Sequence, residues 1–419
     1  MPTFDDLKNN LPPDTQSLLD EVWGLLSDAD KESLKAALSG FPTEANLMKL
    51  LVKMTANNLK LAFGGKHKVA IVGPANVGKS TLYNQLIRSK TDVAEVSPLP
   101  GTTRINRQAD AGVFSVIDTP GADAVGDVGQ REKEEALRAS KDADFLVIMF
   151  DAIQGIKLTE RDLFDELRAL NKPYIVVINK TDLVRKDTNK VLDHAATTLN
   201  LNASQILGIS AKDGQNLSKI LLAISIAEPQ IVAALGSALP EYRWFLARRV
   251  IISSASISGV IALSPLPVID FAPLVINQAT MVLGIARVYN YKITLERAKE
   301  LIATLGMGLV GRMVFQQLSK LGGIPGWLLS VAIASSITVV IGYASATWFE
   351  SGEKISSETL NKITKDVASQ ILNSLKTIFS KKPGSKRLQQ AVEDILLEIT
   401  PENEDDINSW DDNLKENDQ

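Results

Sequence analysis

The stretch Gly73-Pro74-Ala75-Asn76-Val77-Gly78-Lys79-Ser80 decides the fold of this chain, because it fits the pattern G-x-x-x-x-G-K-S/T directly after the apolar residues 69–72. Glycine at both ends opens dihedrals that let successive backbone amides point at phosphate oxygens, and the helix that follows offers its positive N-terminus. A chance Gly-rich turn is the weaker alternative, since a strand and a helix flank the stretch on the required sides. The stretch therefore predicts a nucleotide site on an α/β fold, without saying which nucleotide.

The loop and the first turn of its helix supply the expected phosphate contacts. We expect Lys79 to reach the outer phosphates and the Ser80 hydroxyl to bind Mg²⁺. The full set of expected contacts from this stretch is Asn76, Val77, Gly78, Lys79, Ser80 and Thr81.

A second acidic position follows another predicted strand. Residues 113–117 are apolar or β-branched apart from one serine, and they lead into Asp118-Thr119-Pro120-Gly121. A carboxylate at the carboxyl end of a parallel strand lies where ligands of such sheets collect. We expect Asp118 to hold Mg²⁺ through water, and the Gly121 amide to contact the terminal phosphate.

Two further segments predict that the base is guanine. Residues 174–178 form an apolar run that ends in Asn179-Lys180-Thr181-Asp182. The carboxylate of Asp182 can accept two hydrogen bonds from guanine N1 and N2, a pattern that adenine does not offer. We expect Asn179 to join neighbouring loops and Lys180 to lie along the base.

The last base-binding segment follows residues 206–209. It is Ser210-Ala211-Lys212, whose backbone amides can donate to guanine O6. The amino group of adenine would be rejected there, because two donors would face each other. Together these segments predict that the nucleotide is GTP.

Residues 66–228 resemble the Era-like branch of the translation-factor-related small GTPases. The motifs that carry the resemblance are Asn76 to Ser80, Pro100-Gly101-Thr102-Thr103-Arg104, Asp118 to Gly121, Asn179 to Asp182 and Ser210 to Lys212. The resemblance implies a P-loop GTPase domain with a mostly parallel sheet and helices on both faces, which hydrolyses GTP with Mg²⁺. It also implies that one threonine of the Gly-Thr-Thr segment closes over the metal, and its position favours Thr103 over Thr102. An acidic residue usually follows the arginine of that segment, whereas this chain has Ile105, so this switch differs in detail.

The chain lacks one catalytic residue that is typical of Ras-like GTPases. Many of them place a water-orienting glutamine after the Asp-x-x-Gly turn, where this chain has Ala122. We therefore expect slow intrinsic hydrolysis that depends on Lys79, Thr103 and Gly121 and is accelerated by an ordered loop, another subunit or a monovalent cation.

Two features could supply extra positive charge at the phosphates, and each also has a simpler structural explanation. In several relatives an asparagine at the position of Asn76 helps to bind K⁺, but asparagine also stabilises turns for local reasons, and both roles stay open. Arg104, Arg107 and Arg131 are possible charge donors, although arginines in polar loops are more often solvated.

Composition bounds the rest of the chain. With 419 residues, no cysteine and two histidines, it has room for two or three domains but none for disulfides or thiolate metal sites. The first residues lack the pattern of a secretory signal, so we expect the GTPase domain in the cytoplasm. The net charge of −4 comprises −7 from residue 401 onward and +3 elsewhere, and we expect no nucleic-acid partner.

The predicted domain boundaries follow from these patterns. We expect a helical extension over residues 1–64, the GTPase domain over 65–230, an apolar helical domain over 240–352, amphipathic helices over 353–400 and an acidic disordered tail over 401–419.

The apolar domain predicts membrane association. Residues 321–349 carry no charge over more than the roughly twenty residues that span a bilayer, and Trp327 and Trp348 stand about 31 Å apart along a helix. Residues 250–291 predict a hairpin, with one helix to about residue 263, a proline-containing turn at 264–267, and a second helix capped by Asp270 and ending at Tyr291. The alternative is a tightly packed soluble helical core.

Residues 240–350 also resemble a bacterial domain family of unknown function that is often fused behind Era-like GTPases and is usually described as membrane-associated. The resemblance rests on Leu263 to Pro267, Asp270 to Leu274 and the glycine-rich residues 305–312. We therefore expect a GTPase that couples its nucleotide state to a helical domain at a membrane, with lipid and self-association as possible contacts. The alternatives are a dynamin-like remodelling enzyme and a soluble Era-type ribosome or RNA assembly GTPase.

Overall fold

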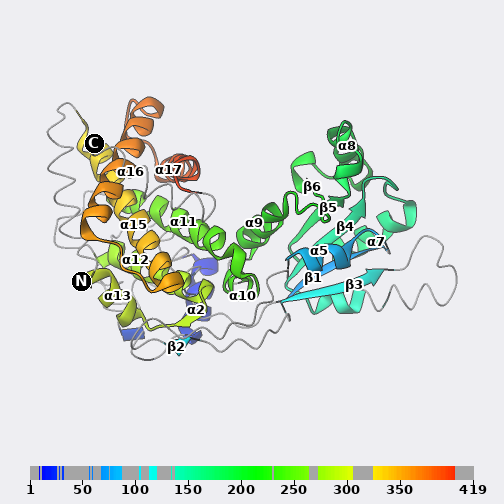
Figure 1. The fold of residues 1–419 in the computed structure, drawn as a ribbon, viewed down its shortest axis with the longest axis horizontal. Coiled ribbons are helices and arrows are strands. Elements are labelled where there is room, and N and C mark those ends of the chain that lie inside the picture. The colour runs from blue at the N-terminus through cyan, green and yellow to red at the C-terminus, as the bar shows by residue number, and fades with distance from the viewer. Residues whose placement is uncertain are drawn as a thin grey trace. The chain divides into compact units, whose positions relative to one another are not determined.

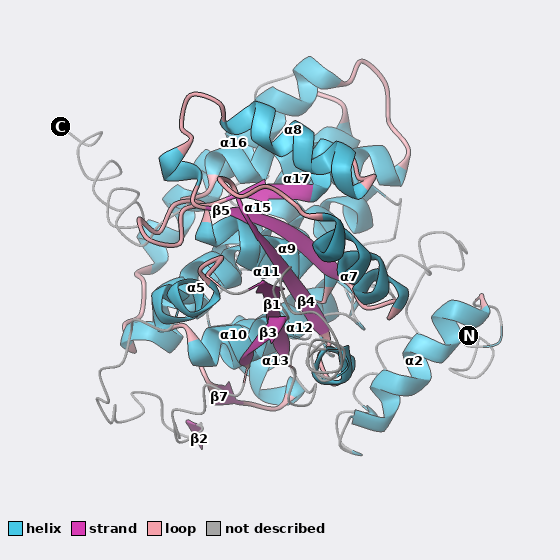
Figure 2. Cartoon of the chain, turned by 90° about the vertical axis from the view of Figure 1, so that its right-hand side faces the viewer, coloured by secondary structure: helices cyan, strands magenta, loops and turns pink. Residues whose placement is uncertain are grey.

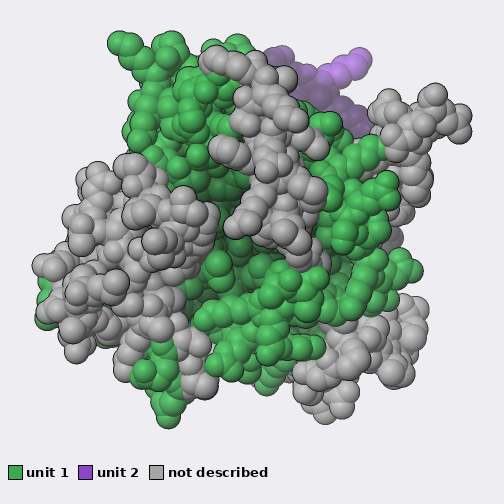
Figure 3. Space-filling view, turned by 90° about the vertical axis from the view of Figure 1, so that its left-hand side faces the viewer, with its two compact units in different colours: residues 1–64, 95–106, 243–419 green, residues 65–94, 107–242 purple. Residues whose placement is uncertain are grey.

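A computed structural model describes most of the chain as two compact units. The described residues are 12–25, 68–86 without 75, 103–104, 113–119, 137–228, 231–263, 272–304, 324–401 and the isolated residues 9, 28, 31, 32, 56, 59 and 134. One unit comprises residues 65–94 and 107–242, which we call the G unit, and the other comprises residues 1–64, 95–106 and 243–419, which we call the helical unit (Figure 3).

The G unit is built on a parallel sheet of five strands in the order β3-β1-β4-β5-β6 (Figure 1). The strands are β1 Val69–Pro74, β3 Phe114–Thr119, β4 Phe145–Asp151, β5 Tyr174–Asn179 and β6 Ile206–Gly208. Two of the interior strands, β1 and β4, are buried along their whole length, as expected for parallel strands with both faces covered. The predicted α/β fold of this domain is confirmed, although the sequence reasoning did not identify β4.

Helices pack against both faces of the sheet, because alternate side chains of each strand point to opposite faces. Leu163, Phe164 and Leu167 of α7 (Leu158–Ala169) and Ala196 and Leu199 of α8 (Thr188–Leu199) share one core with alternate residues of β1, β4 and β5. The intervening strand residues face the other way. There α5 (Lys79–Leu86) contacts β1 and β3, and α9 (Leu217–Ala227) contacts β5. The unit ends with α10 (Ile231–Ala238) and a short 3₁₀ turn, Pro240–Tyr242, while two others, Thr181–Leu183 and Ala203–Gln205, precede it.

The described part of the helical unit is almost entirely α-helix. Its elements are α2 Pro13–Leu25, α11 Arg243–Leu263, α12 Ala272–Val288, α13 Leu295–Thr304, α15 Gly326–Ser351, α16 Ser357–Ile378 and α17 Ser385–Ile399, with a short ladder of β2 Thr103–Arg104 and β7 Tyr291–Lys292. The apolar helices α11 and α15 pack against each other, and α12, α16 and α17 pack around this pair (Figure 1). Gly342 makes that approach possible, because a β-carbon there would lie 2.5 Å from Ile251 Cγ1.

Buried polar side chains join the three apolar helices. Asn277 Nδ2 on α12 donates to Ser254 O and Ser258 Oγ on α11, at 2.7 and 2.9 Å. Gln278 Nε2 donates to Thr338 Oγ1 on α15, at 3.1 Å. Because these donors have few alternative partners in an apolar core, the bonds help to fix the register of α11, α12 and α15.

The second helix of the predicted hairpin is shorter than expected. The described part of α11 runs to Leu263, the expected end of the first helix, whereas α12 ends at Val288 rather than Tyr291. Asn290 then takes a left-handed conformation with φ 68°, and Tyr291 continues as a strand. The turn at 264–267 and Asp270 lie outside the described residues. The predicted helices after residue 353 are present as α16 and α17, and both bury their apolar stripes.

The two segments with membrane-spanning length lie in the helical unit, apart from residues 240–242 at the start of the first. Helical residues 240–263 and α15 are long and apolar enough to cross a bilayer, with mean hydropathies of 1.5 and 1.9 over their best windows. However, 78% and 89% of those windows are buried by the rest of the protein. The described residues thus contain apolar helices that their neighbours, including α16 and α17, cover.

Candidate functional site

The phosphate-binding loop adopts a conformation that glycine alone accommodates at its centre. Gly78 has a φ of +98°, and a β-carbon there would lie 2.3 Å from Asn179 Nδ2. Both observations exclude a side chain at this position. Just before it, Asn76 also takes the left-handed conformation, with φ 64°. That geometry suits an asparagine at a turn, and it leaves its proposed role in K⁺ binding as a prediction.

Lys79 lies folded back along the loop that it is expected to serve. Its side chain is buried, and its Nζ donates to the carbonyl oxygens of Gly73 and Pro74 at 2.7 and 2.6 Å. Those carbonyls hold the ammonium at the carboxyl end of β1. Ser80, the next residue on α5, is exposed. A cation is therefore already fixed at the N-terminus of α5, where an anionic ligand is favoured.

Asn179 joins the two loops that flank the predicted base site. Its Nδ2 donates to Val77 O of the phosphate-binding loop at 2.8 Å, and its Oδ1 accepts from the Ala211 amide at 2.9 Å. The side chain is only 3% exposed, and the groups that it bonds belong to buried residues. A single amide thus fixes the phosphate loop, the end of β5 and the Ser-Ala-Lys segment relative to one another.

Lys180 is held by a residue that the sequence reasoning missed. Its Nζ donates to Asn76 O at 2.8 Å and pairs with the carboxylate of Asp151 at the end of β4. Asp151 also accepts from the Ile153 amide at 2.7 Å, which fixes the carboxylate. The available signal was the apolar run 145–150 followed by an aspartate, the same pattern that was used for Asp118.

The base-specificity residues lie together after β5 and β6. Asp182 belongs to the 3₁₀ turn Thr181–Leu183, and Thr181 Oγ1 anchors this turn by donating to Ile209 O at 2.8 Å. The expected donors to guanine O6 need revision, because the Ala211 amide already serves Asn179 and the Ser210 amide donates to Gln215 O at 3.3 Å. Lys212 is exposed next to them, and its amide is the remaining candidate of the three.

The expected magnesium ligands divide between the two units. Asp118 stands in register with Gly73 across the β1–β3 pair, so it lies at the carboxyl end of the sheet, from which the phosphate-binding loop and then Ser80 of α5 follow β1. Oxygen ligands from these two positions suit Mg²⁺. Thr103 instead belongs to β2 in the helical unit. Gly121, Ala122, Arg107 and Arg131 lie outside the described residues.

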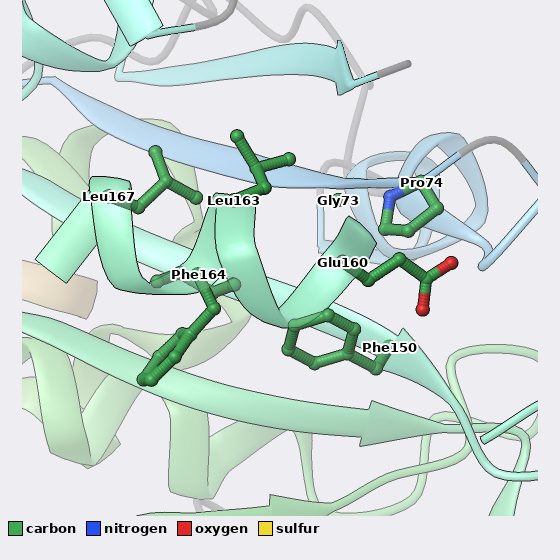
Figure 4. A pocket seen from close by; sticks show the side chains of 8 residues that line it. Gly73, Pro74, Phe150, Glu160, Leu163, Phe164 and Leu167 are labelled. Atoms are coloured by element: carbon green, nitrogen blue, oxygen red, sulfur yellow. The ribbon is translucent and has the colours of Figure 1, made fainter. Parts of the chain in front are cut away.

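A small apolar pocket lies between the first two residues of the phosphate-binding loop and the helix α7. It is lined by Gly73, Pro74, Ile148, Phe150, Glu160, Leu163, Phe164 and Leu167 (Figure 4). Its volume of about 10 Å³ is close to the minimum that a single water needs. Glu160 Oε2 accepts from the Lys157 amide at 3.1 Å, so this carboxylate helps to cap α7. The pocket is a packing feature rather than a ligand site.

Two separate parts of the chain match known protein families. Residues 68–180 match the family model of the 50S ribosome-binding GTPase, and residues 238–377 match the Domain of unknown function (DUF697). GTPase Der of Nitrobacter hamburgensis is 34% identical over 168 residues, which are 39% of this chain and 35% of that protein. GTPase Der of Clostridium botulinum is 36% identical over 166 residues, which are 36% of this chain and 37% of that protein. The chain therefore spans about a third of the length of these relatives.

Solved structures of related GTPases were also found. Era in complex with MgGDPNP and nucleotides 1506–1542 of 16S ribosomal RNA is 29% identical, with 46% of this chain and 67% of that chain covered and a TM-score of 0.30. A single-residue variant of Era from Aquifex aeolicus, bound to GDP and AlF4⁻, is 26% identical, with 48% and 69% covered and a TM-score of 0.30. With the parallel sheet and the loop geometry above, the family matches show a small GTPase domain similar to part of GTPase Der, followed by a region that matches a domain of unknown function.

Proposed function

We propose that this protein binds GTP with Mg²⁺, hydrolyses it slowly, and uses its nucleotide state to control the helical unit. The observation that carries this proposal is the Asn179 bridge. It joins the phosphate-binding loop to the Ser-Ala-Lys segment and stands three residues before the carboxylate of Asp182. A chain that needed only phosphate binding would have no use for the carboxylate and the amides that discriminate guanine from adenine.

The chain has Ala122 at the position where many Ras-like GTPases have a water-orienting glutamine, and this difference supports slow hydrolysis. Ser80, Asp118 and Thr103 are the proposed metal ligands, and Lys79 and Gly121 the proposed phosphate contacts. Asn76 is a proposed K⁺ ligand, which would supply a second cation beside the phosphates.

The specificity claim is tested by replacing one oxygen of Asp182. Asp182→Asn keeps the size of the side chain but removes the charge and one acceptor, so two charge-assisted hydrogen bonds to guanine are weakened. We expect the Kd for GTP to rise by about 100-fold or more, because bonds to charged groups contribute about 1.5–3 kcal/mol each. Asp187→Asn, an exposed carboxylate five residues away that pairs with Lys190, is the matched control.

Isothermal titration calorimetry with GTP, GDP and ATP measures these affinities. Equal affinities of the wild type for GTP and ATP would refute guanine specificity. A Lys79→Ala variant that still bound GTP normally would refute the placement of the phosphates themselves.

We also propose that the helical unit associates with a membrane. Two helices have the required length and hydropathy, which supports this proposal. Their burial also fits a second reading, in which they form the core of a soluble bundle. The cover over α11 is specific: Arg249 Nη1 pairs with Glu393 of α17 at 2.8 Å, and Lys382 Nζ donates to Leu263 O at 2.9 Å. Lipid contact by α11 would therefore require α17 to move, or would be confined to the surface of the unit.

Fractionation of the full-length protein distinguishes the two readings. Recovery in the membrane fraction after a carbonate wash is expected for inserted helices, whereas recovery entirely in the soluble fraction would refute membrane association. GTPase assays of the fractions in K⁺ and in Na⁺ test Asn76, because turnover that is indifferent to K⁺ would remove its proposed ion-binding role.

A further inference from the structure

The strand β7 is a short edge that the helical unit holds in a fixed position. It follows α12 through the left-handed Asn290, and its Tyr291 ring is fully buried against Phe349 of α15, with ring centroids 5.2 Å apart. Beyond the strand, Thr294 Oγ1 accepts from the Arg297 amide in the first turn of α13, at 3.2 Å. Both ends of β7 are thus anchored, so its backbone groups form a preset edge.

The partner on that edge is the segment in which we expect the switch threonine. β2 and β7 are antiparallel, with Thr103 opposite Lys292 and Arg104 opposite Tyr291. Figure 2 shows the two short strands near each other. Residues 95–106 accordingly group with the helical unit, although the chain on both sides of them belongs to the G unit. Addition of an extended segment to an exposed edge is a general mode of peptide recognition, in which backbone hydrogen bonds supply the affinity.

We propose that β7 is a docking edge for the switch segment, and that the β2–β7 ladder competes with Mg²⁺-bound GTP for Thr103. This inference rests on the proposed function, because it takes Thr103 as the ligand that closes over the metal. In the nucleotide-free and GDP-bound protein the ladder holds the segment. GTP recruits Thr103 through Mg²⁺ and frees β7, so that the helical unit responds to the γ-phosphate.

The size of the ladder suits such a competition. Two paired residues contribute only one or two hydrogen bonds, each with a small net free energy. A ligand that binds the open state more tightly than the paired state can supply that free energy. If the ladder is formed in about nine of ten nucleotide-free molecules, the apparent affinity for GTP is reduced about tenfold, because only the open fraction binds. GDP lacks the phosphate that recruits the threonine, so its affinity is independent of the ladder.

Proline substitutions on both strands test this competition. Opposed residues in an antiparallel pair alternate between hydrogen-bonded and non-bonded, so either the Lys292 amide or the Arg104 amide donates within the ladder. One of the variants Lys292→Pro and Arg104→Pro therefore removes a ladder donor. The matched controls Lys292→Ala and Arg104→Ala keep every backbone amide.

We expect one proline variant to bind a non-hydrolysable GTP analogue with Mg²⁺ up to about tenfold more tightly than its alanine control, with unchanged GDP affinity. Equal analogue affinities for both proline–alanine pairs would overturn the competition. Hydrogen exchange of the wild-type protein gives a second measurement that needs no substitution. The amides of residues 103–104 and 291–292 should lose mutual protection with the analogue but not with GDP, and retained β7 protection would likewise overturn the proposal.

The failure of this inference is distinguishable from failure of the proposed function. A wild-type protein that bound neither GTP nor the analogue would refute the proposed function, and the competition with it. Normal analogue binding with an unchanged ladder would refute the competition alone.

Discussion

Replacement of Asn179 by alanine should loosen the G unit and its nucleotide site together. The substitution removes two hydrogen bonds, of 2.8 Å to Val77 O and 2.9 Å from the Ala211 amide. Val77 and Ala211 are 3% and 1% exposed, so their backbone groups would lose their partner inside the protein. A buried polar group without a partner costs about 1–3 kcal/mol, which gives a total of about 2–6 kcal/mol. We take about 3 kcal/mol, because water can enter the space that the side chain leaves.

A loss of about 3 kcal/mol should lower the Tm of a unit of this size by about 6–12 °C. Differential scanning calorimetry of the nucleotide-free protein measures the shift, and titration with GTP measures the accompanying loss of affinity. Asn189→Ala, an exposed position on α8, is the matched control and should leave both quantities within about 0.5 kcal/mol of the wild type. A Tm for Asn179→Ala within about 1–2 °C of that control would refute the view that this bridge holds the two loops together.

Four further substitutions have defined outcomes. Gly78→Ala should reduce GTP affinity at least tenfold in a binding assay, because its β-carbon would lie 2.3 Å from Asn179 Nδ2 at a positive φ, and unchanged affinity would contradict the loop geometry. Arg248→Met should lower the Tm of the helical unit, because the guanidinium donates to Leu397 O at 2.6 Å and to Thr400 O at 3.0 Å. Burial lowers the pKa of Arg287, and its Nε and Nη1 make no hydrogen bond with the described residues. Arg287→Met should therefore leave the Tm of the helical unit unchanged or raise it, and a large fall in Tm would contradict this expectation. Partial desolvation raises the pKa of the exposed Asp366, although Lys365 and Lys362 oppose this shift. Its carboxyl therefore binds protons more tightly in the folded state, and stability falls slightly as the pH rises above the usual aspartate pKa; urea unfolding of Asp366→Asn should show a smaller fall over that window.

The composition of the helical unit does not distinguish membrane-spanning helices from the buried core of a helical bundle. A run of uncharged residues has the same appearance in a membrane span and in the centre of a bundle, because both environments exclude charge. α16 and α17 lie around the apolar helices, and their amphipathic stripes supply the apolar surface that lipid would otherwise provide. Only the arrangement of α11, α15, α16 and α17 shows that such a cover exists.

The GTPase half was predictable in type because its motifs fall at the ends of recognisable apolar runs. The sequence did not predict β4 and Asp151, because no familiar motif follows that strand, although Asp151 holds Lys180 in place. The division of the Ser210 and Ala211 amides between protein partners was not predictable, because a sequence names backbone donors without showing what they face.

The sequence by itself determined the phosphate-binding loop and the helical character of the second half, and it predicted the guanine-recognition residues, since these depend on local patterns of glycine, charge and apolar spacing. Tertiary structure decided three matters. It placed Asn179 between two loops, enclosed the apolar helices, and paired Thr103 with Lys292 across nearly two hundred residues. The physical reason is that each depends on which distant backbone or side chain lies opposite, and no local propensity specifies that partner.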